Sequence, residues 1–142
     1  MGIIVQFGAG NVGRGHIGHI FSRAGYKVVF ADVDDELISS LRKSGYYIVR
    51  LIGNSIREEV VDNFEIYHIE KDREILTGYL SQADIIPTAV GPNIYLSLAP
   101  IIAEGIKGHV PAPVNVIACE NFYRSTERLK GEIFRYLSPL PD

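Results

Sequence analysis

The chain has 142 residues, a length typical of one domain with a core of its own. Apolar residues make up 46% of it and charged residues 22%, as in ordinary globular proteins, and no apolar run is long enough to span a membrane. The formal net charge of −3 argues against nucleic acid or an anionic membrane as a partner. Cys119 is the only cysteine, which excludes an internal disulfide and leads us to expect a cytoplasmic protein.

The first part of the chain carries the main functional pattern. Residues 3–7 form a short apolar run that predicts a buried strand. Glycines follow at the spacing G-x-G-x-x-G, and apolar residues at 17, 20, 21 and 24 then repeat as in an amphipathic helix. A strand, a glycine turn and a helix in this order are the context in which such glycines bind a dinucleotide.

Each of the three glycines has a physical task in that interpretation. Gly8 allows the tight turn out of the strand, Gly10 lets a pyrophosphate approach the backbone, and Gly13 lets the helix pack closely on the sheet. The N-terminus of the helix offers free N–H groups and the positive end of its dipole to the phosphates. The residues expected to bind the pyrophosphate are Gly8, Ala9, Gly10, Asn11, Val12 and Gly13.

A carboxylate follows the next predicted strand, at residues 27–31. Asp32 stands nineteen residues beyond Gly13 and is followed by Val33. A carboxylate there accepts hydrogen bonds from the adenosine ribose of NAD and repels the 2′-phosphate of NADP. Asp32 could instead begin a turn or cap the helix that starts at Asp34. With the glycine pattern beside it, the sequence predicts NAD as the cofactor, with Asp32 and Val33 in its site.

Strand and helix patterns alternate along the rest of the chain. They predict helices over 34–44, 72–82, 93–107 and 121–137, and strands over 46–52, 55–61, 64–69, 83–90 and 113–119. Gly53 and Asn54 predict a hairpin, Pro87 predicts an irregular ladder, and Pro100 predicts a kink or a late helix start. The fold class expected is α/β, a doubly wound and mostly parallel Rossmann sheet with an inserted β-hairpin.

Two further strand ends carry candidate site residues, because ligands of an open parallel sheet bind at the carboxyl ends of its strands. Gly91 and Pro92 line the nicotinamide ribose or form a simple strand-to-helix turn. Glu120 and Asn121 contact the nicotinamide or a polar substrate, or they stabilise and cap the last helix. We expect Cys119 to be a small core residue, since no base lies near it, and the scattered histidines predict no metal site.

The same stretches resemble a known family. Residues 8–15, 17–18, 30–33, 88–92, 117–121 and 124–131 are similar, in this order, to sequence blocks of the polyol-specific long-chain dehydrogenases, in the group of the mannitol-1-phosphate 5-dehydrogenases. The resemblance covers nearly the whole chain. It implies hydride transfer between NAD and a sugar phosphate, from mannitol 1-phosphate to fructose 6-phosphate, with the cofactor contacts at the positions named above.

The resemblance also implies where the catalytic residues of the family lie. The family's catalytic lysine belongs to a C-terminal helical domain, in a K-x-x-x-x-N-x-x-H-like pattern that surrounds none of the five lysines here. Residues 1–142 are therefore expected to be the dinucleotide-binding domain without a catalytic residue, and the proline-rich residues 138–142 resemble a linker to a second domain. Three alternatives stay open: another polyol or hexuronate dehydrogenase, a stand-alone NAD-binding or sensing module, and FAD or S-adenosylmethionine as the ligand.

Overall fold

A computed structural model describes residues 1–109 and 113–137 of the chain. Its elements in chain order are β1 (Ile3–Phe7), η1 (Gly13–Gly18), α1 (His19–Arg23), β2 (Lys27–Asp32), α2 (Asp35–Ser44), β3 (Tyr47–Ile52), β4 (Ile56–Val61), β5 (Phe64–His68), α3 (Arg73–Leu80), β6 (Ile85–Thr88), η2 (Pro92–Ile94), α4 (Tyr95–Lys107), β7 (Asn115–Ala118) and α5 (Ser125–Phe134). The predicted linker at 138–142 lies outside the described residues. No helix within them is long and apolar enough to cross a membrane.

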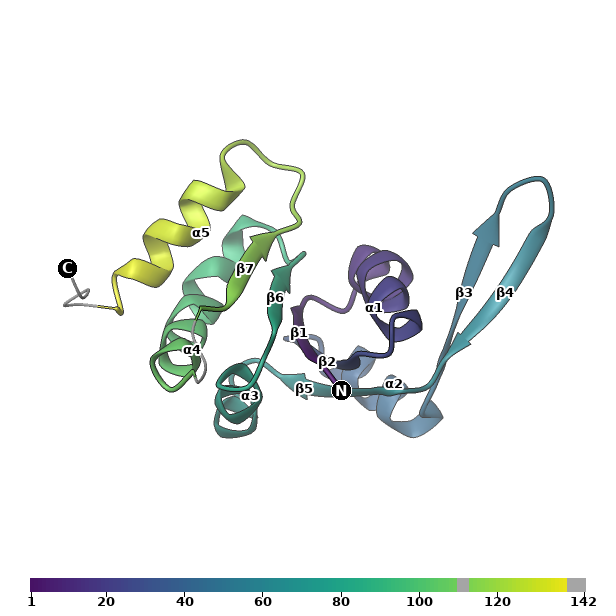
Figure 1. The fold of residues 1–142 in the computed structure, drawn as a ribbon, viewed down its shortest axis with the longest axis horizontal. Coiled ribbons are helices and arrows are strands. Elements are labelled where there is room, and N and C mark those ends of the chain that lie inside the picture. Colours follow the sequence, from purple (N-terminus) through teal and green to yellow (C-terminus); the bar gives the residue numbers. More distant parts are fainter. Residues whose placement is uncertain (110–112, 138–142) are drawn as a thin grey trace.

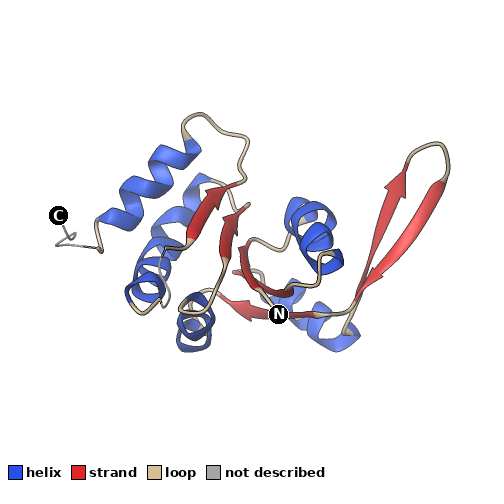
Figure 2. Ribbon diagram, viewed as in Figure 1, coloured by secondary structure: helices blue, strands red, loops and turns tan. Residues whose placement is uncertain are grey.

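Five strands form one parallel sheet in the order β5-β2-β1-β6-β7 (Figure 1). Successive side chains of a strand point to opposite faces, so β1 contributes Val5 and Phe7 to one core and Ile4 to the other. The first core is completed by α3, α4 and α5, and the second by η1 and α2. Figure 2 shows helices on both sides of the strands. This arrangement confirms the predicted doubly wound Rossmann sheet.

Strand β6 has an irregularity at Pro87, as its missing N–H predicts. Its pairing with β1 is interrupted there: Ile4 pairs with Ile85 and Phe7 with Thr88, and no pair forms between these two. The register is the same on both sides of the interruption. The amide of Ala89 then donates to the carbonyl of Phe7, which places Ala89 beside the glycine loop (residues 8–13) after β1. The helix that follows, α4, runs through Pro100 and does not start late at it.

The predicted hairpin is a separate two-stranded sheet made of β3 and β4. Figure 1 shows it extending away from the main sheet and its helices. Its inward side chains Tyr47, Val49 and Val61 are buried in the core that η1 and α2 share. The hairpin therefore does not extend the edge of the parallel sheet, but its Tyr47 packs on Phe64 of the edge strand β5.

The helix after the glycine loop differs from the amphipathic α-helix predicted by its apolar spacing. Its first part, η1, is a π-helix, and only the five residues of α1 are α-helical. Ile17 is buried as predicted, but Ile20 is 50% exposed. A π-helix closes each turn between residues five apart, so the predicted stripe of 3.6-residue period does not face one side.

Two glycines five residues apart account for the wide turn. A Cβ on Gly13 would lie 2.0 Å from the carbonyl oxygen of Gly8, and one on Gly18 would lie 2.6 Å from the ring of Phe30. Both positions press the helix backbone against the sheet, and only glycine permits that approach. A five-residue turn brings the two glycines to the same side of the helix.

Replacing Gly18 by alanine is expected to destabilise the protein by about 1–3 kcal/mol, because the new methyl group overpacks a filled contact with Phe30. Urea unfolding followed by circular dichroism measures the change. Gly15→Ala is the matched control in the same helix, since a Cβ there would meet no described atom within 4 Å. Equal stability of the two variants would contradict the packing role of Gly18.

Candidate functional site

The glycine loop contains one glycine that is packed against neighbouring atoms, Gly8, and one that has free space beside it, Gly10. Gly8 has a φ of +97°, which L side chains rarely adopt, and a Cβ on it would lie 2.3 Å from the carbonyl oxygen of Ala89. Its amide donates to the carbonyl of Ala31 at the end of β2, at 2.7 Å. Gly10 is exposed, and a Cβ on it would meet no described atom within 4 Å. The loop therefore leaves free space at Gly10, immediately before the start of η1.

Gln6 supports this loop from inside the sheet, a contact that the glycine spacing does not indicate. It is fully buried in β1, and its Nε2 donates to the carbonyls of Phe7 at 2.9 Å and of Gly8 at 3.3 Å. The only signal for it in the sequence is a polar side chain within an apolar strand.

Asp32 ties the glycine loop to the turn after β2. Its Oδ2 accepts a hydrogen bond from the amide of Ala9 at 2.8 Å, and its Oδ1 accepts from the amides of Val33 and Asp34 at 2.7 and 3.0 Å. Asp34, not Asp32, caps α2, through the amides of residues 36 and 37. Asp32 therefore belongs to the turn and does not cap the helix. A carboxylate can accept about four hydrogen bonds, and Asp32 already accepts three, so one acceptor position remains for a ligand.

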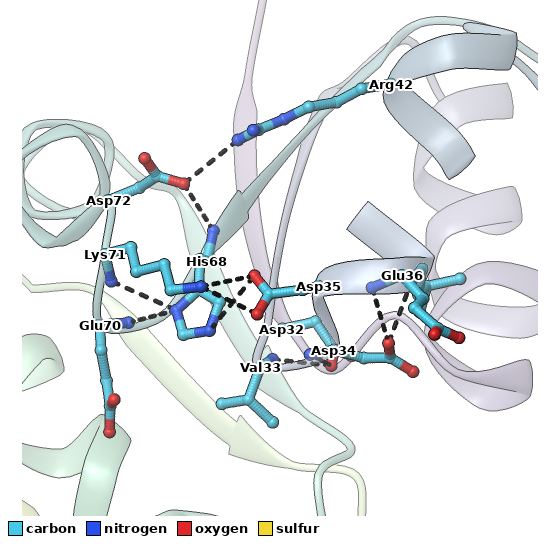
Figure 3. Close-up of polar contacts among 11 residues, drawn as sticks. Asp32, Val33, Asp34, Asp35, Glu36, Arg42, His68, Glu70, Lys71 and Asp72 are labelled. Atoms are coloured by element: carbon cyan, nitrogen blue, oxygen red, sulfur yellow. Dashed lines mark hydrogen bonds and ion pairs between the residues drawn. The ribbon is translucent and has the colours of Figure 1, made fainter. Parts of the chain in front are cut away.

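Acidic side chains surround this turn (Figure 3). Asp35 begins α2, and both of its oxygens accept from the Nζ of Lys71, at 2.8 and 2.9 Å. That contact holds the pKa of Asp35 below its ordinary value. Lys71 comes just after β5, which pairs with β2, so the ion pair joins the ends of two neighbouring strands. The nearest lysine is therefore already engaged with a carboxylate.

Removing this ion pair is expected to change the acid titration of the turn. Because the folded pKa of Asp35 is lowered, the pair stabilises the fold above the ordinary carboxylate pKa of about 4, and this stability is lost as the pH falls through the folded value. Lys71→Met should raise the pKa of Asp35, read by NMR titration of its carboxyl carbon. Lys43→Met on α2 is the control, and an equal shift in both variants would contradict a specific pair.

Glu120 joins the ends of β6 and β7. Its carboxylate accepts from the hydroxyl of Thr88 at 2.8 Å and from the amides of Val90 and Gly91 at 3.0 and 2.9 Å. Gly91 has a φ of +81°, so glycine is required at this turn. The carboxylate therefore sets the shape of the loop at Gly91 and Pro92, which lies at the same edge of the sheet as the glycine loop.

At the end of β7, the capping interpretation of Asn121 and the expectation for Cys119 were wrong. The last helix starts at Ser125 and its N-cap is Arg124, so Asn121 does not cap it. Asn121 is exposed in the preceding loop, near Glu120 in sequence. Cys119 is exposed and not a core residue, and it follows the edge strand β7. Partial desolvation of its sulfur and the charge of Glu120 raise the pKa of the thiol.

The predicted site residues thus gather at one edge of the sheet. The glycine loop, Asp32 and Glu120 follow β1, β2 and β7, and hydrogen bonds connect each to a neighbouring strand end. The arrangement offers an open backbone position, an acidic turn and a second loop held by a carboxylate. Within residues 1–109 and 113–137 no three His, Cys, Asp or Glu side chains are placed to hold a metal ion.

Sequence comparisons show which known proteins the chain is similar to. A mannitol-1-phosphate 5-dehydrogenase from Anoxybacillus flavithermus is 39% identical over 137 residues, 96% of this chain and 36% of that protein. One from Pseudarthrobacter chlorophenolicus is 44% identical over 131 residues, 91% of this chain and 34% of that protein. The chain therefore spans about a third of the length of these curated relatives.

Solved structures share the fold at low sequence identity. A glycerol-3-phosphate dehydrogenase from Coxiella burnetii superposes with a TM-score of 0.62 at 16% identity, over 96% of this chain and 38% of that one. The family model that describes the mannitol dehydrogenase Rossmann domain matches residues 2–140. A Rossmann domain of a dehydrogenase implies a nicotinamide cofactor. On this match over nearly its whole length, the chain belongs to the mannitol dehydrogenase family, as the Rossmann domain of that family.

Proposed function

We propose that this chain binds NAD and forms the cofactor domain of a cytoplasmic dehydrogenase that transfers a hydride between NAD and a polyol phosphate. The names of the relatives support mannitol 1-phosphate and fructose 6-phosphate as the substrate pair. Because these relatives are almost three times as long as the matched region, we assign the substrate pocket and the proton acceptor to a part of the protein beyond this domain. NAD supplies the hydride acceptor when it is bound.

The observation that carries the proposal is the open backbone at Gly10 beside the carboxylate of Asp32. A pyrophosphate needs a helix N-terminus and backbone that no side chain covers. The free space at Gly10 supplies the second condition, and η1 follows immediately. Asp32 hydrogen-bonds to Ala9 in this loop, so the ribose and phosphate contacts are held at a fixed separation.

The nicotinamide end of the site is assigned to the loops after β6 and β7. Glu120 fixes Val90 and Gly91 through their amides, and Pro92 follows as the first residue of η2. We propose that Gly91 and Pro92 line the nicotinamide ribose, with Asn121 beside them. In this role Glu120 is a positioning residue, because its oxygens already accept three hydrogen bonds.

Preference for NAD over NADP follows from the charges near Asp32. A 2′-phosphate on the adenosine ribose would add about two negative charges beside Asp32, Asp34 and Asp35. The one lysine seen among these carboxylates, Lys71, is paired with Asp35. The site therefore offers acceptors for ribose hydroxyls, and its carboxylates repel the extra phosphate.

Calorimetric titration tests this proposal on the folded chain. NAD is expected to bind at least about tenfold more tightly than NADP, and equal affinities would contradict the assignment. Asp32→Asn should weaken NAD binding by about tenfold to a hundredfold and narrow the preference, because it removes the charge that accepts the ribose hydroxyls. Asp35→Asn is the control for NAD affinity alone, because Asp35 is exposed and contacts Lys71 in place of the glycine loop, whereas its charge also repels the 2′-phosphate.

A further inference from the structure

The projecting hairpin has an apolar outer face. Cross-strand pairing places Ile48 opposite Val60 and Ile52 opposite Ile56, and all four point to the side away from the core. These four side chains are between 52% and 81% exposed. The antiparallel sheets of globular proteins normally alternate apolar residues toward the core with polar residues toward water. This hairpin is apolar on both sides, which marks its outer face as a contact surface.

One charged pair lies between the two apolar pairs. Arg50 is opposite Glu58, and their side chains form an ion pair at 3.3 Å on the same outer face. We use the name outer face for the six residues Ile48, Arg50, Ile52, Ile56, Glu58 and Val60. Along the hairpin the outer face thus runs from an apolar pair through a pair of opposite charges to a second apolar pair.

The hairpin is held so that this face points away from the rest of the chain. The hydroxyl of Tyr47 donates to the carbonyl of Arg14 in η1, at 3.0 Å. On β4, an oxygen of Glu59 lies 2.6 Å from the Nε2 of His19 in α1. Both anchors are on the inner side, because Tyr47 and Glu59 alternate with the residues of the outer face. These two contacts fix the orientation of the hairpin, and with it the direction of the outer face.

We propose that the outer face binds the outer face of a second copy of this chain. A two-fold axis parallel to the strands places Ile48 over Val60 of the second copy and Ile52 over its Ile56. The same rotation places Arg50 over Glu58 of the second copy. A two-fold axis across the strands would instead place each charge over its own kind, which is repulsive. The surface is therefore complementary to itself in one orientation, as an isologous interface requires.

The size of the face sets the expected strength of the dimer. Six residues from each copy form a small interface, at the low end of those that associate specifically. We expect a dimer that dissociates on dilution through the micromolar range. The inference is independent of NAD, since the outer face lies on β3 and β4 and the proposed cofactor loops follow β1, β2, β6 and β7.

Sedimentation velocity of the 142-residue chain over a range of concentrations tests the proposal. The wild-type chain should shift from monomer to dimer as its concentration rises. Ile52→Ser combined with Ile56→Ser should weaken the association by about a hundredfold or more, because it removes one apolar pair from each copy. Leu96→Ser is the matched control, since Leu96 is 64% exposed on α4, away from the hairpin. Far-ultraviolet circular dichroism confirms that each variant is folded.

Charge reversal separates this interface from non-specific apolar contact. Arg50→Glu should weaken the dimer, because it places two carboxylates together, and the exposed ion pair itself contributes little to folding. Adding Glu58→Arg to Arg50→Glu should restore the dimer. A chain that stays monomeric at every concentration would overturn the proposal and leave the face to some other partner. A dimer that none of these changes alters would overturn it as well.

Discussion

Gly10→Val is expected to abolish NAD binding while the protein stays folded. A Cβ at Gly10 meets no described atom within 4 Å, and Gly10 does not have a positive φ. The substitution should therefore change the free energy of unfolding by no more than about 0.5 kcal/mol. The same space is where the pyrophosphate approaches the backbone, and the branched side chain fills it. We expect NAD affinity to fall at least about a hundredfold, which corresponds to about 2.7 kcal/mol.

Two measurements on the same samples decide this prediction. Urea unfolding reports stability, and calorimetric titration with NAD reports binding. Gly78→Val on α3 is the control, because a Cβ there also meets no described atom within 4 Å and α3 lies away from the glycine loop. Full NAD affinity in a folded Gly10→Val protein would mean that the glycine pattern serves only as a turn.

Much of the fold and the site follows from local sequence patterns. The short apolar runs and the glycines between them predict a parallel sheet, and the structure has it. Gly8 shows the positive φ expected of the tight turn, and Gly13 shows the close approach expected beneath the helix. Pro87 marks the interruption in the pairing of β6 with β1 because the absence of an N–H is a property of the residue itself. These features depend on few neighbours, so they can be seen in the sequence.

Contacts between distant segments could not be predicted in the same way. The π-helix depends on Phe30 and on Gly8, which meet Gly18 and Gly13 only in the folded chain. Spacing alone does not reveal that Glu120 accepts from amides about thirty residues earlier in the chain. The capping role considered for Asn121 was wrong for a related reason: Arg124, in a left-handed conformation, ends the loop before the last helix. Side chains that join loops are fixed by tertiary structure, not by local pattern.

The 142-residue polypeptide is expected to bind NAD and yet to show no turnover of mannitol 1-phosphate or fructose 6-phosphate above background. Hydride transfer from an alcohol needs a base that accepts the hydroxyl proton near neutral pH. Glu120 lies at the proposed nicotinamide end, but it accepts three hydrogen bonds from the protein. Burial raises the pKa of Tyr95 to about 12, and burial together with Glu120 raises the pKa of Cys119. Both groups therefore stay protonated at neutral pH.

Three basic residues of the described chain lie away from the proposed nicotinamide end. Lys27 begins β2, at the opposite edge of the sheet, and a hydrogen bond with Tyr79 raises its pKa further. Lys71 is paired with Asp35 near the proposed ribose site. The Nε2 of His109 lies 2.8 Å from the carbonyl of Ala83, before the start of β6. None of these side chains is placed to act as a base at the ends of β6 and β7.

Substrate orientation is the second requirement that this domain lacks. Positioning of reacting groups can contribute roughly 7–11 kcal/mol to lowering a barrier, and the loops at Gly91 and Asn121 contact a bound substrate from one side only in this proposal. The assay follows NADH formation from mannitol 1-phosphate and NADH consumption with fructose 6-phosphate, at high protein concentration. Calorimetry on the same sample shows that NAD binds, so inactivity is not mistaken for unfolding. Turnover that disappears in Glu120→Gln would place the base within these residues, and it would require Glu120 to leave at least one of its three hydrogen bonds during the reaction.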